Sequence, residues 1–256
     1  MNPVDQLVSH WKEIYNSNSP EKELLLHDGE VPKEITHYFQ FELYPEPFYG
    51  YLNDVLSNDA LLLLINPGEF KGNAEEISRL NSFTKERYTI WTKREYLNEK
   101  DLLRKIAPKS IEWRNRKKKQ VERVIPNPKK VNFLHTMELF PYHSKNWTGL
   151  SERAKSWMLN TKTTKLNFEA IKYLTVARKI NNIIGIGINW LDIFERFGYQ
   201  PTYYQPFYND KGNFTHRVFS YQLSEAATPI IIYVANSMHL PKDPNVIKCF
   251  EKLLKV

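Results

Sequence analysis

The clearest structural signal in this 256-residue chain is the sequence Leu61-Leu62-Leu63-Leu64-Ile65-Asn66-Pro67-Gly68-Glu69. Its short, continuous apolar run is typical of a strand that is covered on both faces, as in a parallel sheet. Pro67 and Gly68 end the strand, because proline lacks the N–H that a sheet needs and glycine turns the chain. Asn66 is left at the carboxyl end of the strand, where open α/β sheets bind their ligands. The stretch therefore predicts a polar site at this edge of a sheet.

Three other apolar runs, at residues 131–137, 183–188 and 230–234, predict further buried strands beside the strand at 60–65. An aromatic-rich segment, 201–222, predicts a hairpin. Between these strands the apolar spacing predicts helices at about 1–17, 47–57, 74–81, 84–106, 111–123, 150–159, 167–180 and 244–255, with a short helix after residue 188 and mostly loop over 20–47. This alternation predicts an α/β fold, with three α/β/α layers and a four-stranded, mainly parallel sheet.

Three of the four strand ends carry polar side chains. They are Asn66, the segment 135–138 and the segment 236–239. The carboxyl ends of parallel strands meet at one edge of a sheet, so we expect these three loops to converge on one cleft.

The length allows one large domain or two small ones, and we expect a single domain over 1–256 with a long basic helical insertion at about 69–130. The only cysteine, Cys249, excludes an internal disulfide and any cysteine-ligated zinc or iron–sulfur cluster. A reducing, cytoplasmic setting fits this cysteine use. No apolar run reaches membrane-span length and no signal pattern opens the chain, so no membrane partner is expected.

The basic excess is clustered. The formal net charge is +7, and Trp113 is followed by a run of basic residues: Arg114, Arg116, Lys117, Lys118 and Lys119. A basic cluster beside aromatic residues is typical of a phosphate-binding surface. The alternative is a solvated helix face.

Four short segments of the chain resemble motifs of the uracil-DNA glycosylase superfamily. Ile65-Asn66-Pro67-Gly68 is similar to the first family motif in the form found in the mismatch-specific branch. The segment 236–241 resembles the second motif at Asn236 and Leu240. The segment from His135 to Pro141 resembles the base-reading strand, and 186–189 resembles the third strand and its turn.

The resemblance implies a DNA glycosylase that flips a damaged or modified pyrimidine out of DNA and hydrolyses its N-glycosidic bond. Such an enzyme would act in DNA repair or in defence against phages with modified bases. By this resemblance Asn66 would position the water, His239 would stabilise the leaving base, and Glu69 or Glu138 would supply a carboxylate. We expect no cofactor and no metal ion, DNA as the partner, and a monomer.

The remaining site residues follow from the same resemblance. The base pocket would be lined by Pro67, Gly68, Phe70, His135, Glu138, Phe140 and Asn236. DNA would be contacted by a Leu240 wedge, by His143 and Ser144, and by Arg114, Arg116, Lys117, Lys118 and Lys119. The ordinary alternatives are a Leu240 that packs under the last helix, loop-capping roles for His143 and Ser144, and phenylalanines in the core.

The motifs depart from the family pattern at three positions. Met238 and Ser237 stand where the second motif has serine and proline, and His135 stands where an amide reads the pyrimidine. Because His135 lacks the paired donor and acceptor of an amide, the sequence favours a modified, bulkier base over uracil.

Two other readings compete with a glycosylase. The first is a non-catalytic DNA-binding protein of the same fold. The second is a nucleotide-binding α/β enzyme, suggested by Gly185-Ile186-Gly187-Ile188-Asn189-Trp190, although this segment lacks the third glycine of the dinucleotide fingerprint.

Overall fold

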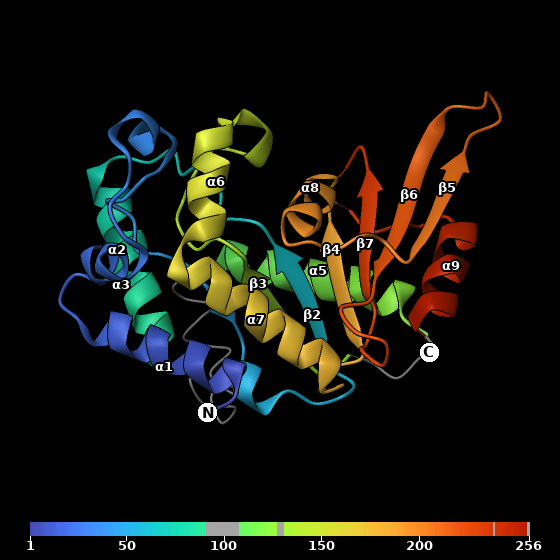
Figure 1. The fold of residues 1–256 in the computed structure, drawn as a ribbon, viewed down its shortest axis with the longest axis horizontal. Coiled ribbons are helices and arrows are strands. Elements are labelled where there is room, and N and C mark those ends of the chain that lie inside the picture. Colours follow the sequence, from blue (N-terminus) through green and yellow to red (C-terminus); the bar gives the residue numbers. More distant parts are fainter. Residues whose placement is uncertain (91–107, 127–130, 238, 255–256) are drawn as a thin grey trace. The chain divides into compact units, whose positions relative to one another are not determined.

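The computed structural model describes residues 1–90, 108–126, 131–237 and 239–254. The chain has an α/β fold and forms two compact units, between which it passes repeatedly (Figure 1). Unit 1 comprises residues 1–54, 64–107 and 136–173, and unit 2 comprises residues 55–63, 108–135 and 174–256. Residues 91–107 and 127–130, where the sequence predicts the end of a helix and part of a basic insertion, lie outside the described residues.

Within the described residues the strands form one mixed sheet of seven strands, so the expected four-stranded, mainly parallel sheet is wrong. In order across the sheet they are β1 (Phe48–Tyr49), β3 (Leu134–Glu138), β2 (Ala60–Leu64), β4 (Asn182–Ile186), β7 (Ile230–Ala235), β6 (Phe214–Tyr221) and β5 (Tyr203–Tyr208). β2, β4 and β7 are parallel, whereas β1 pairs antiparallel with β3, and β6 with both β7 and β5. The two antiparallel pairs of β6 arise because the 201–222 segment forms the predicted hairpin and adds it to the edge of β7.

The four predicted buried strands are confirmed as β2, β3, β4 and β7, with shifted ends. β4 ends at Ile186 because Gly187 has a φ of 112°, a left-handed conformation that side chains disfavour. β2 ends at Leu64, just before the Asn-Pro-Gly turn, in which Gly68 has a φ of 83°.

Unit 1 is mostly helical, with α1 (Pro3–Asn16), α2 (Pro20–Asp28), α3 (Ala74–Ile90), α6 (Glu152–Asn160) and α7 (Lys162–Val176), which extends to the start of unit 2. The Asn2 side chain caps α1 by accepting a hydrogen bond from the Asp5 N–H, and α1 buries Leu7, Trp11 and Ile14. Helix α2 was expected to be loop; it buries only Pro20 and Leu24, so its apolar pattern is too weak to predict a helix. Residues 47–57 form β1 and a 3₁₀ turn, Leu52–Asp54, where a helix was expected.

In unit 2, helices cover both faces of the strands. The helices are α5 (Pro108–Val124), α8 (Asn189–Arg196) and α9 (Pro244–Leu254). Trp190 of α8 lies so close to Gly185 of β4 that a Cβ there would meet the indole at 3.1 Å, and Ile232 of β7 shares this face. Successive strand residues point to opposite faces, so the neighbouring Tyr233 faces the other side, where its ring meets Phe250 of α9. Helix α9 also contacts α5 and β6.

Among the described residues, no helix combines the length and the apolar character that crossing a membrane requires.

Candidate nucleic-acid interface

A basic pocket of about 420 Å³ lies within unit 2. Helix α5, strand β6, strand β7 and the loop after β7 line it. Arg116 and Arg123 come from α5, Lys242 from the loop, and His216 and His239 from β6 and the loop. None of the described residues that line the pocket is acidic. This composition suits an anion, and in particular the phosphates of a nucleic acid.

Gln120 of α5 holds the loop at the rim of this pocket. Its side-chain oxygen accepts a hydrogen bond from the Leu240 N–H at 3.1 Å, and its Nε2 lies 3.1 Å from His239 Nδ1. Since the Leu240 N–H can only donate, the Gln120 oxygen must face it, and the amide NH₂ therefore faces His239. Nδ1 of His239 is thus the acceptor, and the neutral ring carries its proton on Nε2.

Two further contacts fix the pocket wall. Arg123 Nη1 donates to the Pro241 carbonyl at 3.3 Å. The Tyr233 hydroxyl lies 2.7 Å from His216 Nδ1, and the two rings are stacked. Burial, followed by the charge of Asp243, raises the pKa of Tyr233 to about 12, so its hydroxyl keeps its proton at neutral pH.

The predicted basic run divides between the surface and the interior. Arg116 is exposed at the pocket and Lys119 is exposed away from it, whereas Arg114 and Lys118 are half-buried. Lys117 is only 4% exposed and lies over the Trp113 ring, so its expected phosphate contact is corrected. Burial, followed by the charge of Arg116, lowers the pKa of Lys117. Consecutive helical residues point about 100° apart, and a continuous charge run cannot share one face.

Exposed aromatic side chains lie on one face of the β5–β6 hairpin. Tyr208 and Phe214 are 55% and 56% exposed, their ring centroids lie 4.6 Å apart, and the Arg217 guanidinium lies over Phe214. β6 pairs with β7 only from His216 onward, so Phe214 and the turn extend beyond the end of β7 (Figure 1). Exposed, closely spaced aromatic rings beside an arginine suit unpaired bases.

In unit 1, Asn66 lies just beyond β2, which ends at Leu64, with Ile65 between them. Its Nδ2 donates to the Ser144 carbonyl at 3.1 Å and lies 3.0 Å from the Ser144 hydroxyl. The amide nitrogen is thereby occupied, and the amide oxygen is the part of the side chain that can accept a hydrogen bond from a water. The arrangement is compatible with a role in holding a water.

The loop after Asn66 is fastened in two more places. The Gln40 amide forms a pair of hydrogen bonds with the backbone of Phe70, at 2.7 and 2.8 Å. His143 donates from Nδ1 to the Gly68 carbonyl at 3.0 Å, and its Nε2 lies 3.3 Å from a Glu46 oxygen. His143 and Ser144 are both buried, so they hold this loop, and their expected phosphate contacts are corrected.

Three other expected contacts fall in the interior. His135 has no exposed surface and its Nε2 lies 3.0 Å from the Asp59 carboxylate. Phe140 packs among aromatic rings in unit 1, and Leu240 is 2% exposed. We therefore correct their roles as base reader, stacking partner and wedge, because each side chain is almost completely buried.

The remaining site residues lie at or near the surface. Glu69, Asn236 and His239 are exposed, and Pro67, Gly68, Phe70 and Glu138 are half-buried. Glu69 lies 4.0 Å from Lys71, a weak surface pair. Asn66 belongs to unit 1, and Asn236 and His239 belong to unit 2, so their convergence on one cleft stays a prediction.

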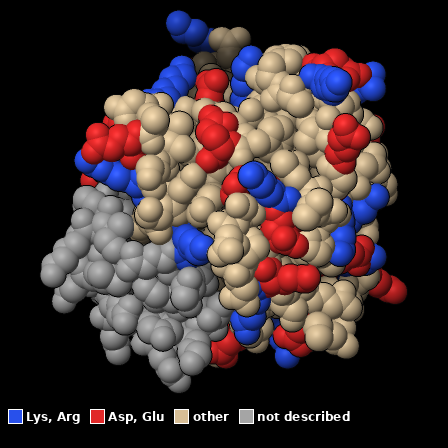
Figure 2. Space-filling view, turned by 90° about the vertical axis from the view of Figure 1, so that its left-hand side faces the viewer, with Lys and Arg blue, Asp and Glu red and all other residues tan. Residues whose placement is uncertain are grey.

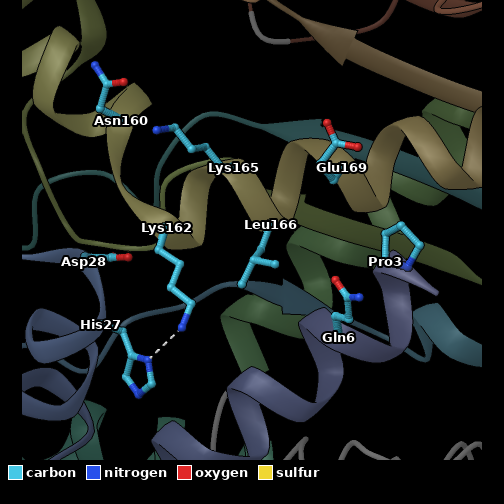
Figure 3. A pocket seen from close by; sticks show the side chains of 9 residues that line it. All are labelled: Pro3, Gln6, His27, Asp28, Asn160, Lys162, Lys165, Leu166 and Glu169. Carbon is cyan, nitrogen blue, oxygen red and sulfur yellow. Dashed lines mark hydrogen bonds between the residues drawn. The ribbon is translucent and has the colours of Figure 1, made fainter. Parts of the chain in front are cut away.

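A second cavity, of about 550 Å³, lies in unit 1 and has mixed charge. His27, Lys162 and Lys165 line it together with Asp28 and Glu169 (Figure 3). Burial raises the pKa of Asp28, although hydrogen bonds from Thr163 and Tyr142 oppose the rise. Figure 2 views the left-hand side of Figure 1, where acidic and basic side chains alternate over the described surface. The cavity therefore suits a polyanion less well than the basic pocket does.

Sequence reasoning found only part of the basic pocket. Arg116 and His239 were predicted as site residues, whereas Arg123, Lys242 and His216 were not. No local signal marks these three, because only the folding of α5 against the paired strands β6 and β7 brings them together.

Comparison of the chain with family models, with curated proteins and with solved structures gave no match.

Proposed function

We propose that the chain is a DNA glycosylase that removes a damaged or modified pyrimidine and binds the DNA backbone through the basic pocket. The observation that carries the DNA-binding part of the proposal is this pocket, in which Arg116, Arg123 and Lys242 gather without an acidic neighbour among the described lining residues. Most of the affinity for DNA comes from such contacts to phosphates.

The chemistry is proposed from the resemblance of the motifs. The Asn66 oxygen would hold a water near the sugar C1′, and Glu69 is an exposed carboxylate three residues along the chain. Hydrolysis breaks the N-glycosidic bond through an oxocarbenium-like sugar, and the base leaves with the bonding electrons. His239 presents its Nε2–H as a donor to the leaving base. Under this proposal the two units belong to one α/β/α glycosylase-like domain, and the protein is a cytoplasmic monomer that acts in repair or antiviral defence.

A second candidate is a non-catalytic DNA-binding protein. The interior positions of His135, Phe140 and Leu240 favour it, because they remove the expected base reader, stacking ring and wedge from the surface. The basic pocket serves this candidate equally well.

One experiment separates the two candidates. The protein is incubated with single- and double-stranded oligonucleotides that carry deaminated or modified pyrimidines. Abasic sites are then revealed by alkaline cleavage, and released bases are identified by mass spectrometry. Release by the wild type, and loss of release in Asn66→Ala with DNA binding retained, supports the glycosylase. Binding without release over the whole panel favours the second candidate, and absence of binding contradicts both.

A further inference from the structure

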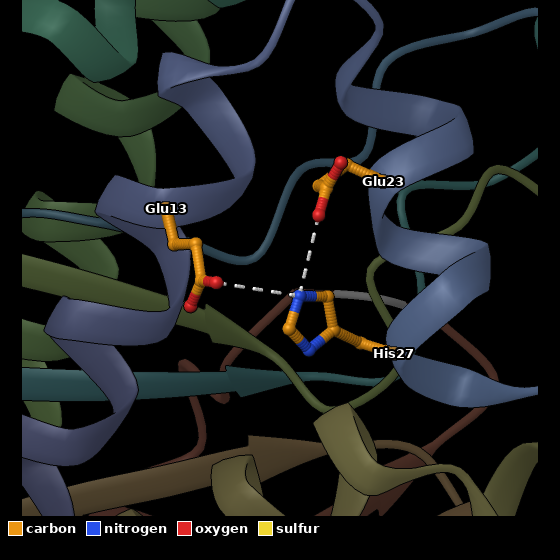
Figure 4. A group of neighbouring side chains, drawn as sticks. All are labelled: Glu13, Glu23 and His27. Atoms are coloured by element: carbon orange, nitrogen blue, oxygen red, sulfur yellow. Dashed lines mark ion pairs between the residues drawn. The ribbon is translucent and has the colours of Figure 1, made fainter.

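Three side chains on two neighbouring helices of unit 1 point toward one another (Figure 4). Glu13 lies on α1, whereas Glu23 and His27 lie one turn apart on α2. One oxygen of each glutamate and Nε2 of the histidine all lie within 4.8 Å of one another. A carboxylate and an imidazole four residues apart on a helix, with a third ligand from the next helix, form a chelating arrangement.

The distances within this group leave room for a metal ion between its ligand atoms. His27 Nε2 lies 3.6 Å from Glu23 and 3.9 Å from Glu13. Both distances exceed the 2.7–3.2 Å that is usual for an N–H···O hydrogen bond. A tetrahedral zinc ion with bonds of about 2.1 Å keeps its ligand atoms about 3.4 Å apart. Small side-chain movements therefore bring all three atoms to bonding distance of one ion.

We propose that Glu13, Glu23 and His27 bind a divalent transition-metal ion, with Zn²⁺ as the best fit. Two carboxylates and a neutral imidazole supply hard and intermediate ligands, and two negative charges balance the ion. Glu13 is largely exposed, which leaves the fourth position open to water. The ion would join α1 to α2 in unit 1. The site is independent of the proposed glycosylase activity.

Lys162, at the start of α7, opposes this ion and makes the proposal testable. Its ammonium group lies 3.3 Å from His27 Nδ1 (Figure 3). An ammonium can only donate, so Nδ1 accepts, and the neutral ring carries its proton on Nε2. An ion on Nε2 requires the single proton of the neutral ring to lie on Nδ1 instead, where it points at the ammonium. Because Lys162 is exposed, it can turn away, but its presence weakens the binding.

The test titrates Zn²⁺ into the full chain by isothermal titration calorimetry in a non-chelating buffer near neutral pH. Glu23→Gln removes a ligand charge and is expected to weaken the site about tenfold or more. Lys162→Gln replaces the opposing donor by an amide whose oxygen can accept from Nδ1–H, and is expected to tighten it. Lys165→Gln, with the same charge change one turn along α7 at the wall of the same cavity, is the matched control.

Circular dichroism first establishes that each variant is folded. Weaker binding in Glu23→Gln and tighter binding in Lys162→Gln, with Lys165→Gln unchanged, supports the site. A visible spectrum of four-coordinate Co²⁺ that is lost in His27→Ala supports it independently. The proposal is overturned if the wild type shows no Zn²⁺ binding, or if Glu23→Gln and His27→Ala bind Zn²⁺ as the wild type does.

Discussion

Gln120 and His239 join helix α5 to the loop after β7 through a 3.1 Å contact between the glutamine Nε2 and the histidine Nδ1. The same amide receives the N–H of Leu240, so one buried side chain holds two consecutive residues of the rim. The basic helix and the segment 236–241 were predicted separately, and this contact joins them in the wall of the basic pocket.

Replacement of Gln120 by alanine should disturb both stability and DNA binding. The variant loses two hydrogen bonds and leaves the Leu240 N–H without its partner, which should lower the free energy of unfolding by about 1–3 kcal/mol. Urea unfolding measures the stability, and fluorescence anisotropy with labelled DNA measures the affinity. Wild-type affinity in a folded Gln120→Ala protein would show that the rim does not contribute to binding.

The salt dependence of DNA binding should report the arginines and the lysine of the pocket. Arg116→Gln and Lys242→Gln should each reduce the slope of log Kd against log salt by about 0.9 for duplex DNA, if each side chain contacts one phosphate. Lys119→Gln, exposed on the same helix but outside the pocket lining, is the charge-matched control. Equal slopes in all three variants would argue against the pocket.

The aromatic face of the hairpin should favour single strands. Tyr208→Ala and Phe214→Ala should each weaken binding of single-stranded DNA by about 1–3 kcal/mol, because each loses one stacking surface. The salt slope should stay the same, since no charge changes. Ile188→Ala, exposed elsewhere in unit 2, is a control for loss of surface apolar area.

The buried pair of Asp59 and His135 should matter for stability alone. Both side chains have no exposed surface, and their contact is 3.0 Å long. Asp59→Ala should lower the free energy of unfolding by about 3 kcal/mol or more, because it leaves a buried polar partner behind. Urea unfolding tests this, and the salt slope of DNA binding should not move. A change below about 1 kcal/mol would contradict the prediction.

His10 should make the stability depend on pH. Its pKa falls from 6.5 to about 4, mainly through burial and then through the charges of His27 and Lys162. The unfolded chain binds a proton at His10 below pH 6.5, whereas the folded chain does so only near pH 4. The free energy of unfolding should therefore fall as the pH drops through this window, by at most about 1.4 kcal/mol per pH unit from this group.

His10→Gln isolates this contribution. The glutamine keeps a polar group near the Thr163 hydroxyl, which His10 contacts at 3.1 Å, but does not titrate. The difference in the free energy of unfolding between the two proteins should change between pH 6.5 and 4, and stay constant above pH 7. A constant difference over the whole range would contradict the assignment.

The sequence predicts the elements that carry a strong local pattern. The apolar runs that form β2, β4 and β7 are continuous, and burial on both faces requires that composition. Helix α2 lacked such a signal, since Leu24 is its one buried large apolar residue. The residues of the candidate site are likewise predictable only where a local sequence signal exists. Asn66 follows from its place after a strand, whereas the burial of Lys117 depends on which face of α5 meets the core.

The loop from Asn66 to Phe70 is tied to unit 1 by Gln40, His143 and Ser144. The loop therefore loses its conformational entropy during folding, before any ligand binds. A ligand that meets Asn66 finds a rigid template instead of a closing lid, and binding there should leave the loop backbone where it is.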